Sequence, residues 1–297
     1  MKLEEISSLV SEIPEHWFRP DCPELGDVEE LLYGSTYYAG DGSPLLKPCY
    51  VYTPFGYDPE DEETRYDVFY FMHGFLCNAN SMFEGDEGAI GNIFDWLIYE
   101  KKTKPFIAVA LTWDYENAIR DFDTSCKQIL QFHMEFRQDI LPAVESKYHT
   151  YAKSTDSKGL RESRDHRAFG GFSLGSVTTW LQFCHDTDYI RYFLPMSGSS
   201  WYYGTYGDFQ TVRNVDYVQQ IVEENDLNER GYFIYHAVGT EDVVKSQTLM
   251  MAEEMLSRDG VFPPEHYVFY QKAGGHHDFD AVQEFMFNAL PLFFPQG

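Results

Sequence analysis

The segment 171–175, Gly-Phe-Ser-Leu-Gly, is the part of the sequence whose residue types and spacing indicate chemistry most clearly. Residues 167–172 before the serine read as a short strand, and residues 177–183 after it read as a helix. A serine at such a junction, with a glycine two residues to either side, is typical of a nucleophile elbow. The start of the helix also offers free N–H groups that favour an oxyanion. The sequence therefore predicts Ser173 as a nucleophile.

A serine nucleophile needs a histidine to accept its proton and a carboxylate to orient that histidine. In chains with this type of elbow the order is serine, acid, histidine, so both partners should follow Ser173. Asp242 lies just after a hydrophobic strand that runs into Gly239, and we predict that it is the acid. The adjacent Glu241 is the alternative acid. The non-catalytic interpretation is that Asp242 only caps the loop in which it lies.

The candidates for the base are the histidines that follow the serine: His185, His236, His266, His276 and His277. His236 falls within a predicted strand and His266 precedes one, whereas His276 and His277 lie in a glycine-rich loop after the last strand. One of these two neighbours should be the base and the other a loop or substrate contact. The residues alone leave open which is which.

An oxyanion hole needs one N–H from the residue after the nucleophile and one from a loop after an earlier strand. Leu174 supplies the first. The second should come from the loop after residues 70–73, with Phe75 as the first choice and Leu76 as the reserve. His73 is expected to brace this loop by hydrogen bonding rather than to act in catalysis.

Strand-like and helix-like segments alternate along the chain, which predicts an α/β fold with a mainly parallel central sheet flanked by helices, as in α/β-hydrolases. The expected strands are residues 50–53, 67–72, 106–111, 167–172, 192–195, 232–238 and 267–270. The expected helices are residues 91–100, 125–148, 173–185, 215–224, 245–258 and 281–290. We expect residues 1–297 to form one domain, with residues 1–30 as an N-terminal extension packed on it.

The charge balance of 22 Lys and Arg against 48 Asp and Glu argues against nucleic-acid or anionic-membrane partners. The five cysteines show neither metal-site nor disulfide-framework spacing, and we expect no metal or cofactor. Residues 1–15 do not resemble a secretory signal and no segment is apolar enough to span a membrane. We therefore expect a cytoplasmic protein, or a secreted one if a signal was removed, of unknown oligomeric state.

Taken in order, these segments resemble the feruloyl and acetyl-xylan esterases of carbohydrate esterase family 1, the group related to esterase D. The resemblance covers most of the chain and rests on residues 51–57, 71–74, 140–148, 163–176, 239–242 and 289–294. It implies a catalytic triad of Ser173, Asp242 and His277, because the family's histidine is commonly followed by an acidic or aromatic pair, here Asp278-Phe279. The loop after Gly74 lacks the extra glycines of many members.

In such esterases the leaving group is a sugar hydroxyl, and the acyl group is acetyl or a hydroxycinnamate. The resemblance thus implies a small-molecule or oligosaccharide ester as substrate, with Trp113, Trp201, Tyr202 and His276 as candidate substrate contacts. Feruloyl ester hydrolysis is the leading hypothesis. The alternatives are an acetyl-xylan or general short-acyl carboxylesterase, related thioester hydrolases and acyltransferases, and a catalytically silent carbohydrate-binding relative.

Overall fold

The protein is built on one eight-stranded sheet, seen in a computed structural model that describes residues 12–84, 89–114, 121–204 and 210–296. The strands are β1 (Asp27–Thr36), β2 (Pro44–Thr53), β3 (Asp67–Met72), β4 (Phe106–Leu111), β5 (Arg167–Phe172), β6 (Tyr192–Met196), β7 (Phe233–Gly239) and β8 (Tyr267–Lys272). They lie in the order β1-β2-β4-β3-β5-β6-β7-β8. β1 and β2 form a hairpin and β2 pairs antiparallel with β4, while the other neighbours are parallel. The predicted mainly parallel α/β sheet is confirmed.

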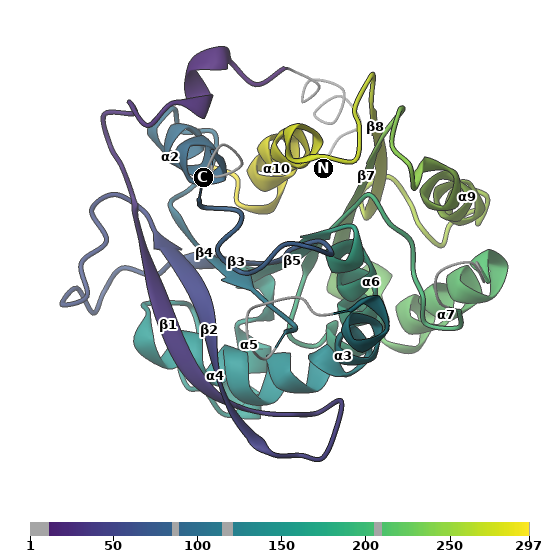
Figure 1. The fold of residues 1–297 in the computed structure, drawn as a ribbon, viewed down its shortest axis with the longest axis horizontal. Coiled ribbons are helices and arrows are strands. Elements are labelled where there is room, and N and C mark those ends of the chain that lie inside the picture. The colour runs from purple at the N-terminus through teal and green to yellow at the C-terminus, as the bar shows by residue number, and fades with distance from the viewer. Residues whose placement is uncertain (1–11, 85–88, 115–120, 205–209, 297) are drawn as a thin grey trace.

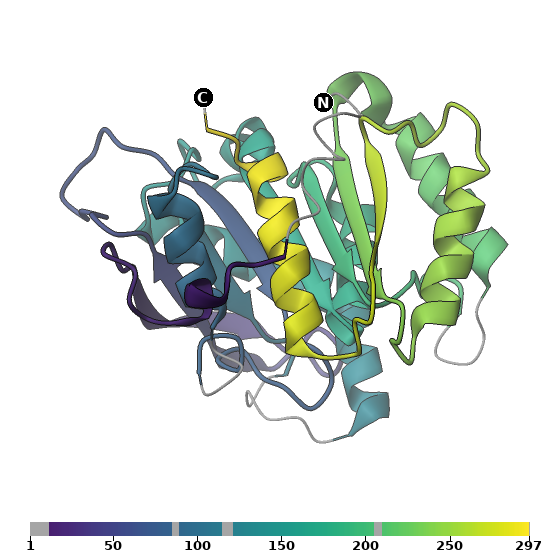
Figure 2. The ribbon, with the colours of Figure 1, turned by 90° about the horizontal axis from the view of Figure 1, so that it is seen from above.

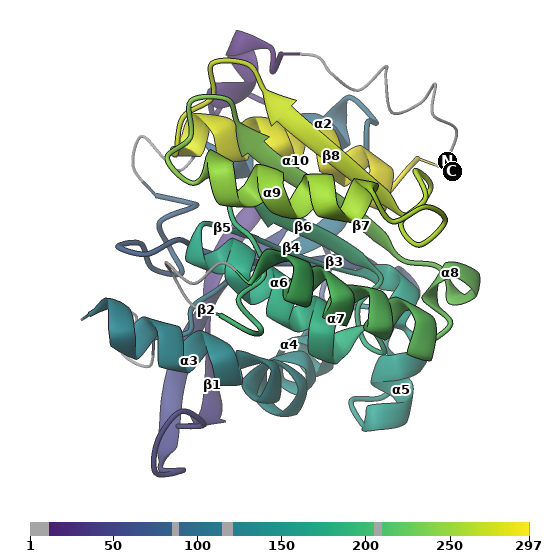
Figure 3. The ribbon, with the colours of Figure 1, turned by 90° about the vertical axis from the view of Figure 1, so that its right-hand side faces the viewer.

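Helices cover both faces of this sheet (Figure 1). They are α2 (Ile90–Tyr99), α3 (Phe122–Glu135), α4 (Leu141–Lys147), α5 (Ser157–Glu162), α6 (Leu174–Asp186), α7 (Thr211–Glu224), α8 (Leu227–Arg230), α9 (Lys245–Leu256) and α10 (Phe279–Phe293), with short turns η1 (Glu15–Phe18), η3 (Phe136–Ile140) and η4 (Arg164–His166). Helices α2 and α10 pack on one face, as Figure 2 shows from above. Helices α3, α6 and α7 pack on the other face (Figure 3). No helix of the described segments combines the length and apolar character needed to cross a membrane.

The central strands β3, β4, β5 and β7 are buried along their whole length. This follows from the helices on both faces, and it explains why these strands read as continuous apolar runs rather than alternating ones. Each parallel strand ends at the same edge of the sheet. The loops that carry candidate functional residues therefore meet at this carboxyl edge.

The described part of the predicted N-terminal extension packs against the helices of one sheet face. Trp17 is 1% exposed and stacks on Trp96 of α2, with ring centroids 6.2 Å apart, and its edge meets Phe287 of α10. Residues 1–11 lie outside the described residues. The chain enters the sheet as β1 at Asp27. That residues 1–297 form one domain stays a prediction.

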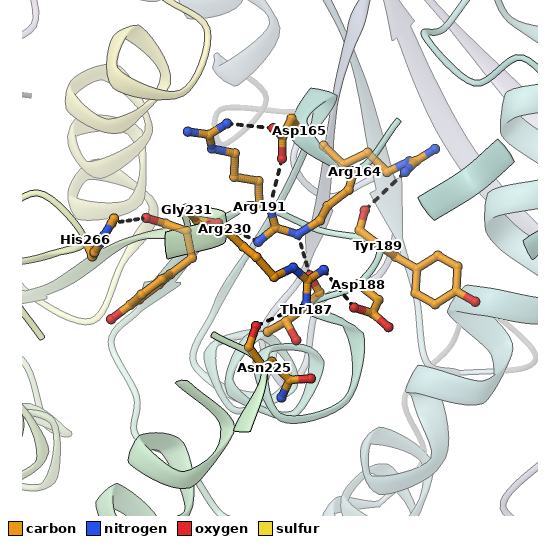
Figure 4. Close-up of polar contacts among 12 residues, drawn as sticks. Arg164, Asp165, Thr187, Asp188, Tyr189, Arg191, Asn225, Arg230, Gly231 and His266 are labelled. Atoms are coloured by element: carbon orange, nitrogen blue, oxygen red, sulfur yellow. Dashed lines mark hydrogen bonds and ion pairs between the residues drawn. The ribbon is translucent and has the colours of Figure 1, made fainter. Parts of the chain in front are cut away.

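A network of arginines ties together the amino ends of the strands, opposite the carboxyl edge (Figure 4). Arg164, just before β5, donates to the Thr187 and Gly231 carbonyls. Its guanidinium also pairs with Asp165 at 2.8 Å, and Arg191, just before β6, pairs with the other oxygen of the same carboxylate. These contacts fix the starts of β5, β6 and β7 relative to one another.

Candidate active site

Ser173 occupies a strained turn between β5 and α6. Its backbone has φ 58° and ψ −115°, a region that residues with a side chain rarely adopt. The turn is tight enough that a Cβ on Gly171 would clash with the Gly175 carbonyl, and one on Gly175 would clash with the Met72 carbonyl. The two glycines of the motif are therefore required by close backbone approach, as the sequence predicts.

Ser173, His277 and Asp242 form a hydrogen-bonded row. Nε2 of His277 lies 3.0 Å from the Ser173 Oγ. Nδ1 of the same ring lies 2.9 Å and 3.1 Å from the two carboxylate oxygens of Asp242. The ring also packs on Phe172, with centroids 4.5 Å apart. The three side chains predicted as a triad thus meet in the order that proton transfer requires.

Asp242 is held in its ionised form although it is 6% exposed. Burial raises the pKa of this carboxyl. Three hydrogen bonds, from the His277 ring, the Val244 N–H and the Ser197 hydroxyl, together with the charge of His277, outweigh burial and bring the pKa below its usual value. The Val244 N–H donates at 2.8 Å.

The loops that carry Asp242 and His277 are hydrogen-bonded to each other. The Thr240 N–H donates to the Lys272 carbonyl and the Glu241 N–H to the Gly275 carbonyl, both at 2.9 Å. The Thr240 hydroxyl accepts the Gly274 N–H at 2.8 Å. The Glu241 side chain remains exposed, so of the two adjacent carboxylates only Asp242 reaches His277.

The two predicted oxyanion donors, Phe75 and Leu174, both line the space in front of Ser173. Leu174 is the first residue of α6, where an N–H has no partner within its helix. The Phe75 N–H likewise donates to no described residue. Both donors are therefore available to a substrate oxygen.

His73 braces the loop that carries Phe75. Its Nδ1 lies 2.8 Å from the Gly74 carbonyl and its Nε2 lies 2.9 Å from the Thr112 hydroxyl. Burial lowers the pKa of this histidine to about 4, and the charge of Lys47 adds to the effect against an opposing hydrogen bond to the Gly74 carbonyl. Such a ring stays neutral at physiological pH, as a structural role requires.

A cleft of about 470 Å³ opens in front of Ser173. Phe75, Phe122 and Trp201 form an aromatic row along it, with successive ring centroids 5.3 Å and 6.3 Å apart. The other lining residues are Ser173, Leu174, Val177, Ser197, Gly198, Val243, Val244, Gln247 and His277. Sequence reasoning missed Phe122, Val177, Ser197, Gly198, Val243, Val244 and Gln247. Position in the sequence pointed only to Val243 and Val244, which directly follow the predicted acid, and to Ser197 and Gly198, which follow a predicted strand.

Three of the predicted substrate contacts do not line this cleft, which corrects the expectation for Trp113, Tyr202 and His276. Trp113 is 2% exposed and packs on His73, with ring centroids 4.1 Å apart. Tyr202 stacks instead on Tyr217 of α7 at 4.0 Å. The side chain of His276 is exposed beside His277. Of this group only Trp201 reaches the cleft.

The sheet order, the strained serine turn and the row of Ser173, His277 and Asp242 define an α/β-hydrolase fold with a serine-hydrolase type of site. Among the described residues there is no cluster of three or more His, Cys, Asp or Glu side chains suited to a metal ion. No family model matches the chain. Several solved structures and curated protein sequences, however, are similar to this chain.

A feruloyl esterase module from Clostridium thermocellum, solved in complex with sinapinate, is 31% identical to this chain with a TM-score of 0.81, and the match covers 96% of this chain and 93% of that one. A second structure of a protein called FAE is 32% identical, with the same TM-score and coverage. The ferulic acid esterase of Anaeromyces mucronatus, a member of carbohydrate esterase family 1, shares the fold at 19% identity and a TM-score of 0.68 over 94% of this chain and 95% of its own. The chain belongs to the same family as the feruloyl esterase module from Clostridium thermocellum.

The curated relatives are larger proteins. Endo-1,4-beta-xylanase Y from Acetivibrio thermocellus is 32% identical over 286 residues, which are 95% of this chain and 24% of that protein. An endo-1,4-beta-xylanase/feruloyl esterase from Xylanibacter ruminicola is 25% identical over 182 residues, 59% of this chain and 22% of its own length. The chain thus spans about a quarter of the length of the curated relatives it matches.

Proposed function

We propose that the protein is a serine esterase that hydrolyses hydroxycinnamoyl esters, such as feruloyl esters, of plant cell-wall sugars. The observation that carries the proposal is the hydrogen-bonded row of Ser173, His277 and Asp242 at an apolar cleft of about 470 Å³ with an aromatic wall. A flat phenolic acyl group matches such a wall. The feruloyl esterase relative in complex with sinapinate and the relative named xylanase/feruloyl esterase support the same ester class.

In the first half of the reaction Ser173 Oγ attacks the ester carbonyl carbon while Nε2 of His277 accepts the hydroxyl proton. The N–H groups of Phe75 and Leu174 donate to the oxygen that becomes negative. When the tetrahedral intermediate collapses, the bond from the carbonyl carbon to the sugar oxygen breaks and His277 returns its proton to that oxygen. The sugar leaves and the acyl group stays on Ser173.

In the second half a water molecule takes the place of the sugar. His277 accepts one proton from the water, the resulting hydroxide oxygen bonds to the acyl carbon, and the bond to Ser173 Oγ breaks as His277 returns the proton to the serine. Asp242 stabilises the imidazolium in both halves, consistent with its lowered pKa.

Turnover of methyl ferulate beside 4-nitrophenyl acetate tests this proposal. We expect both esters to be hydrolysed, and Ser173→Ala to reduce both rates by several orders of magnitude. Cleavage of the acetate ester without the ferulate ester would favour a short-acyl carboxylesterase. Binding of xylan fragments without turnover of either ester would indicate a catalytically silent carbohydrate-binding protein.

A further inference from the structure

Gln247 is a buried polar side chain in the cleft that the reaction scheme leaves without a role. It lies in the first turn of α9, is 7% exposed and lines the cleft together with Ser173 and His277. Its side-chain oxygen, Oε1, is buried and accepts no hydrogen bond from any described residue. A buried acceptor without a partner is costly, so such a group at a binding cleft is suited to a donor on a ligand.

The surroundings of Gln247 indicate which kind of ligand group it is suited to bind. One turn further along α9, Met251 accepts the Ser200 N–H at 3.2 Å, so this face of the helix lies against the loop that carries Trp201. Among the described residues of the lining, the polar side chains besides Gln247 are Ser173, Ser197 and His277. The other described side chains of the lining are apolar or aromatic.

A sugar in this part of the cleft would leave most of its hydroxyl groups without partners. An aromatic ring that carries one hydroxyl group buries its faces against apolar walls and needs only one polar partner. A phenolic hydroxyl both donates and accepts hydrogen bonds, so it can pair with either end of a side-chain amide.

We propose that Gln247 is a specificity-determining residue whose side-chain amide hydrogen-bonds a hydroxyl group on the aromatic ring of the acyl group. This inference rests on the proposed function and deepens it, because it makes the acyl pocket selective for hydroxylated over unsubstituted cinnamoyl esters. A site built to pair a substrate hydroxyl discriminates against analogues that lack it, since its own polar group is then left buried and unpaired.

The test compares methyl esters of cinnamic, 3-hydroxycinnamic, 4-hydroxycinnamic and 4-methoxycinnamic acid. For the wild type we expect kcat/KM to be roughly ten- to a hundredfold higher for one of the hydroxycinnamates than for cinnamate or the methoxy ester. In Gln247→Leu this advantage should shrink to about twofold or less, because leucine keeps the volume of the side chain and removes the amide. Turnover of 4-nitrophenyl acetate should fall less than turnover of the favoured hydroxycinnamate, since an acetyl group has no ring hydroxyl to bind.

Gln283→Leu is the matched control. Gln283 lies in α10 and is 3% exposed. Its Oε1 also has no hydrogen-bond partner among the described residues, and Gln283 is not among the described residues that line the cleft. This variant should keep the wild-type preference among the four esters. If Gln247→Leu fails to fold, as judged by its circular dichroism, Gln247→Met replaces it in the same comparison of the four esters.

The possible results separate the inference from the proposed function. Turnover of all four cinnamoyl esters at similar rates by the wild type, or an unchanged preference in Gln247→Leu, would overturn the role of Gln247 alone. Absence of turnover with every cinnamoyl ester would refute the proposed function and the inference with it.

Discussion

At the scale of single residues, the two adjacent histidines differ in the direction in which their side chains point. His277 places Nε2 3.0 Å from the Ser173 Oγ and Nδ1 within 3.1 Å of both Asp242 oxygens, while the side chain of His276 is exposed. The next residue, Asp278, caps α10 by accepting the Ala281 N–H at 3.0 Å. The start of this helix thus fixes the chain just after His277.

Replacing the two histidines separately should have very different effects. We expect His277→Gln to lower kcat/KM for 4-nitrophenyl acetate by roughly 10⁴-fold or more, because the serine loses its proton acceptor. His276→Gln should change it by less than about threefold, as a substitution away from the reacting atoms. Steady-state kinetics measure both, and comparable losses in the two variants would contradict the assignment of His277.

The sequence predicts residues that follow strand ends better than residues that line the cleft walls. Ser173, Asp242 and His277 come after β5, β7 and β8, so the topology alone brings them to one edge. The direction of a loop side chain depends instead on what packs beneath it. For example, Nζ of Lys47 donates to the Trp113 carbonyl at 3.2 Å, and no local sequence pattern around Trp113 indicates this contact.

At the scale of elements, the strands buried on both faces were the most predictable. The bounds of β3, β4 and β5 agree with those predicted, because each is a short continuous apolar run. β1 was missed, since it is a half-exposed edge strand whose first residues include Glu29 and Glu30. The prediction of one helix over residues 125–148 was also wrong.

That long helix is interrupted by the π-helical turn η3 between α3 and α4. Pro142 stands at the start of α4 and has no N–H to donate to the Gln138 carbonyl, so regular helical bonding cannot continue through this point. The apolar spacing continues across the turn, with Phe136 and Ile140 both buried. Periodicity therefore predicts the buried face but not the change in helix type.

The arginine network at the amino ends of the strands should stabilise the fold without affecting catalysis. Arg164 is 5% exposed and donates to the Thr187 and Gly231 carbonyls (Figure 4). We expect Arg164→Met to lower the free energy of unfolding by about 2 to 4 kcal/mol, because the buried Thr187 carbonyl and the part-buried Gly231 carbonyl both lose a donor. Urea denaturation measures this change.

Arg230→Met is the control for this prediction. Arg230 pairs with Asp188 at 2.9 Å, but its side chain is 38% exposed. An exposed pair contributes little, so the loss should stay below about 1 kcal/mol. Both variants should keep the wild-type kcat of the folded fraction, because the network lies at the opposite edge of the sheet from Ser173. A fall in kcat for Arg164→Met would show that the two edges are coupled.

At the scale of the whole molecule, stability against acid depends on buried neutral histidines as well as on the net charge of −26. His236 in β7 is 0% exposed, and its ring contacts the Tyr267 hydroxyl at 3.0 Å and the Gly198 carbonyl at 3.1 Å. Burial lowers the pKa of His236 from 6.5 to about 4, against a smaller opposing effect of the Gly198 carbonyl. His73 has a similarly lowered pKa.

A histidine with a lowered pKa destabilises the folded protein in acid. In the unfolded chain it binds a proton below about pH 6.5, while in the folded protein it stays neutral down to about pH 4. The contribution of this histidine to the free energy of unfolding is therefore fully present above about pH 6.5 and is lost as the pH falls towards about 4. For His236 the loss is on the order of 3 kcal/mol. Protonation of surface carboxylates in the same range relieves charge repulsion and acts in the opposite direction.

Comparing variants at each pH separates these two effects. We expect the wild type to lose more of its free energy of unfolding between pH 6.5 and pH 4 than His236→Gln, by on the order of 3 kcal/mol, because glutamine does not titrate while the carboxylates are the same in both proteins. His276→Gln replaces an exposed histidine and should follow the wild type. Urea denaturation at half-unit pH steps measures the difference. Parallel curves for the wild type and His236→Gln would show that His236 takes up its proton without unfolding, and acid stability would then depend on the carboxylates and the other buried histidines.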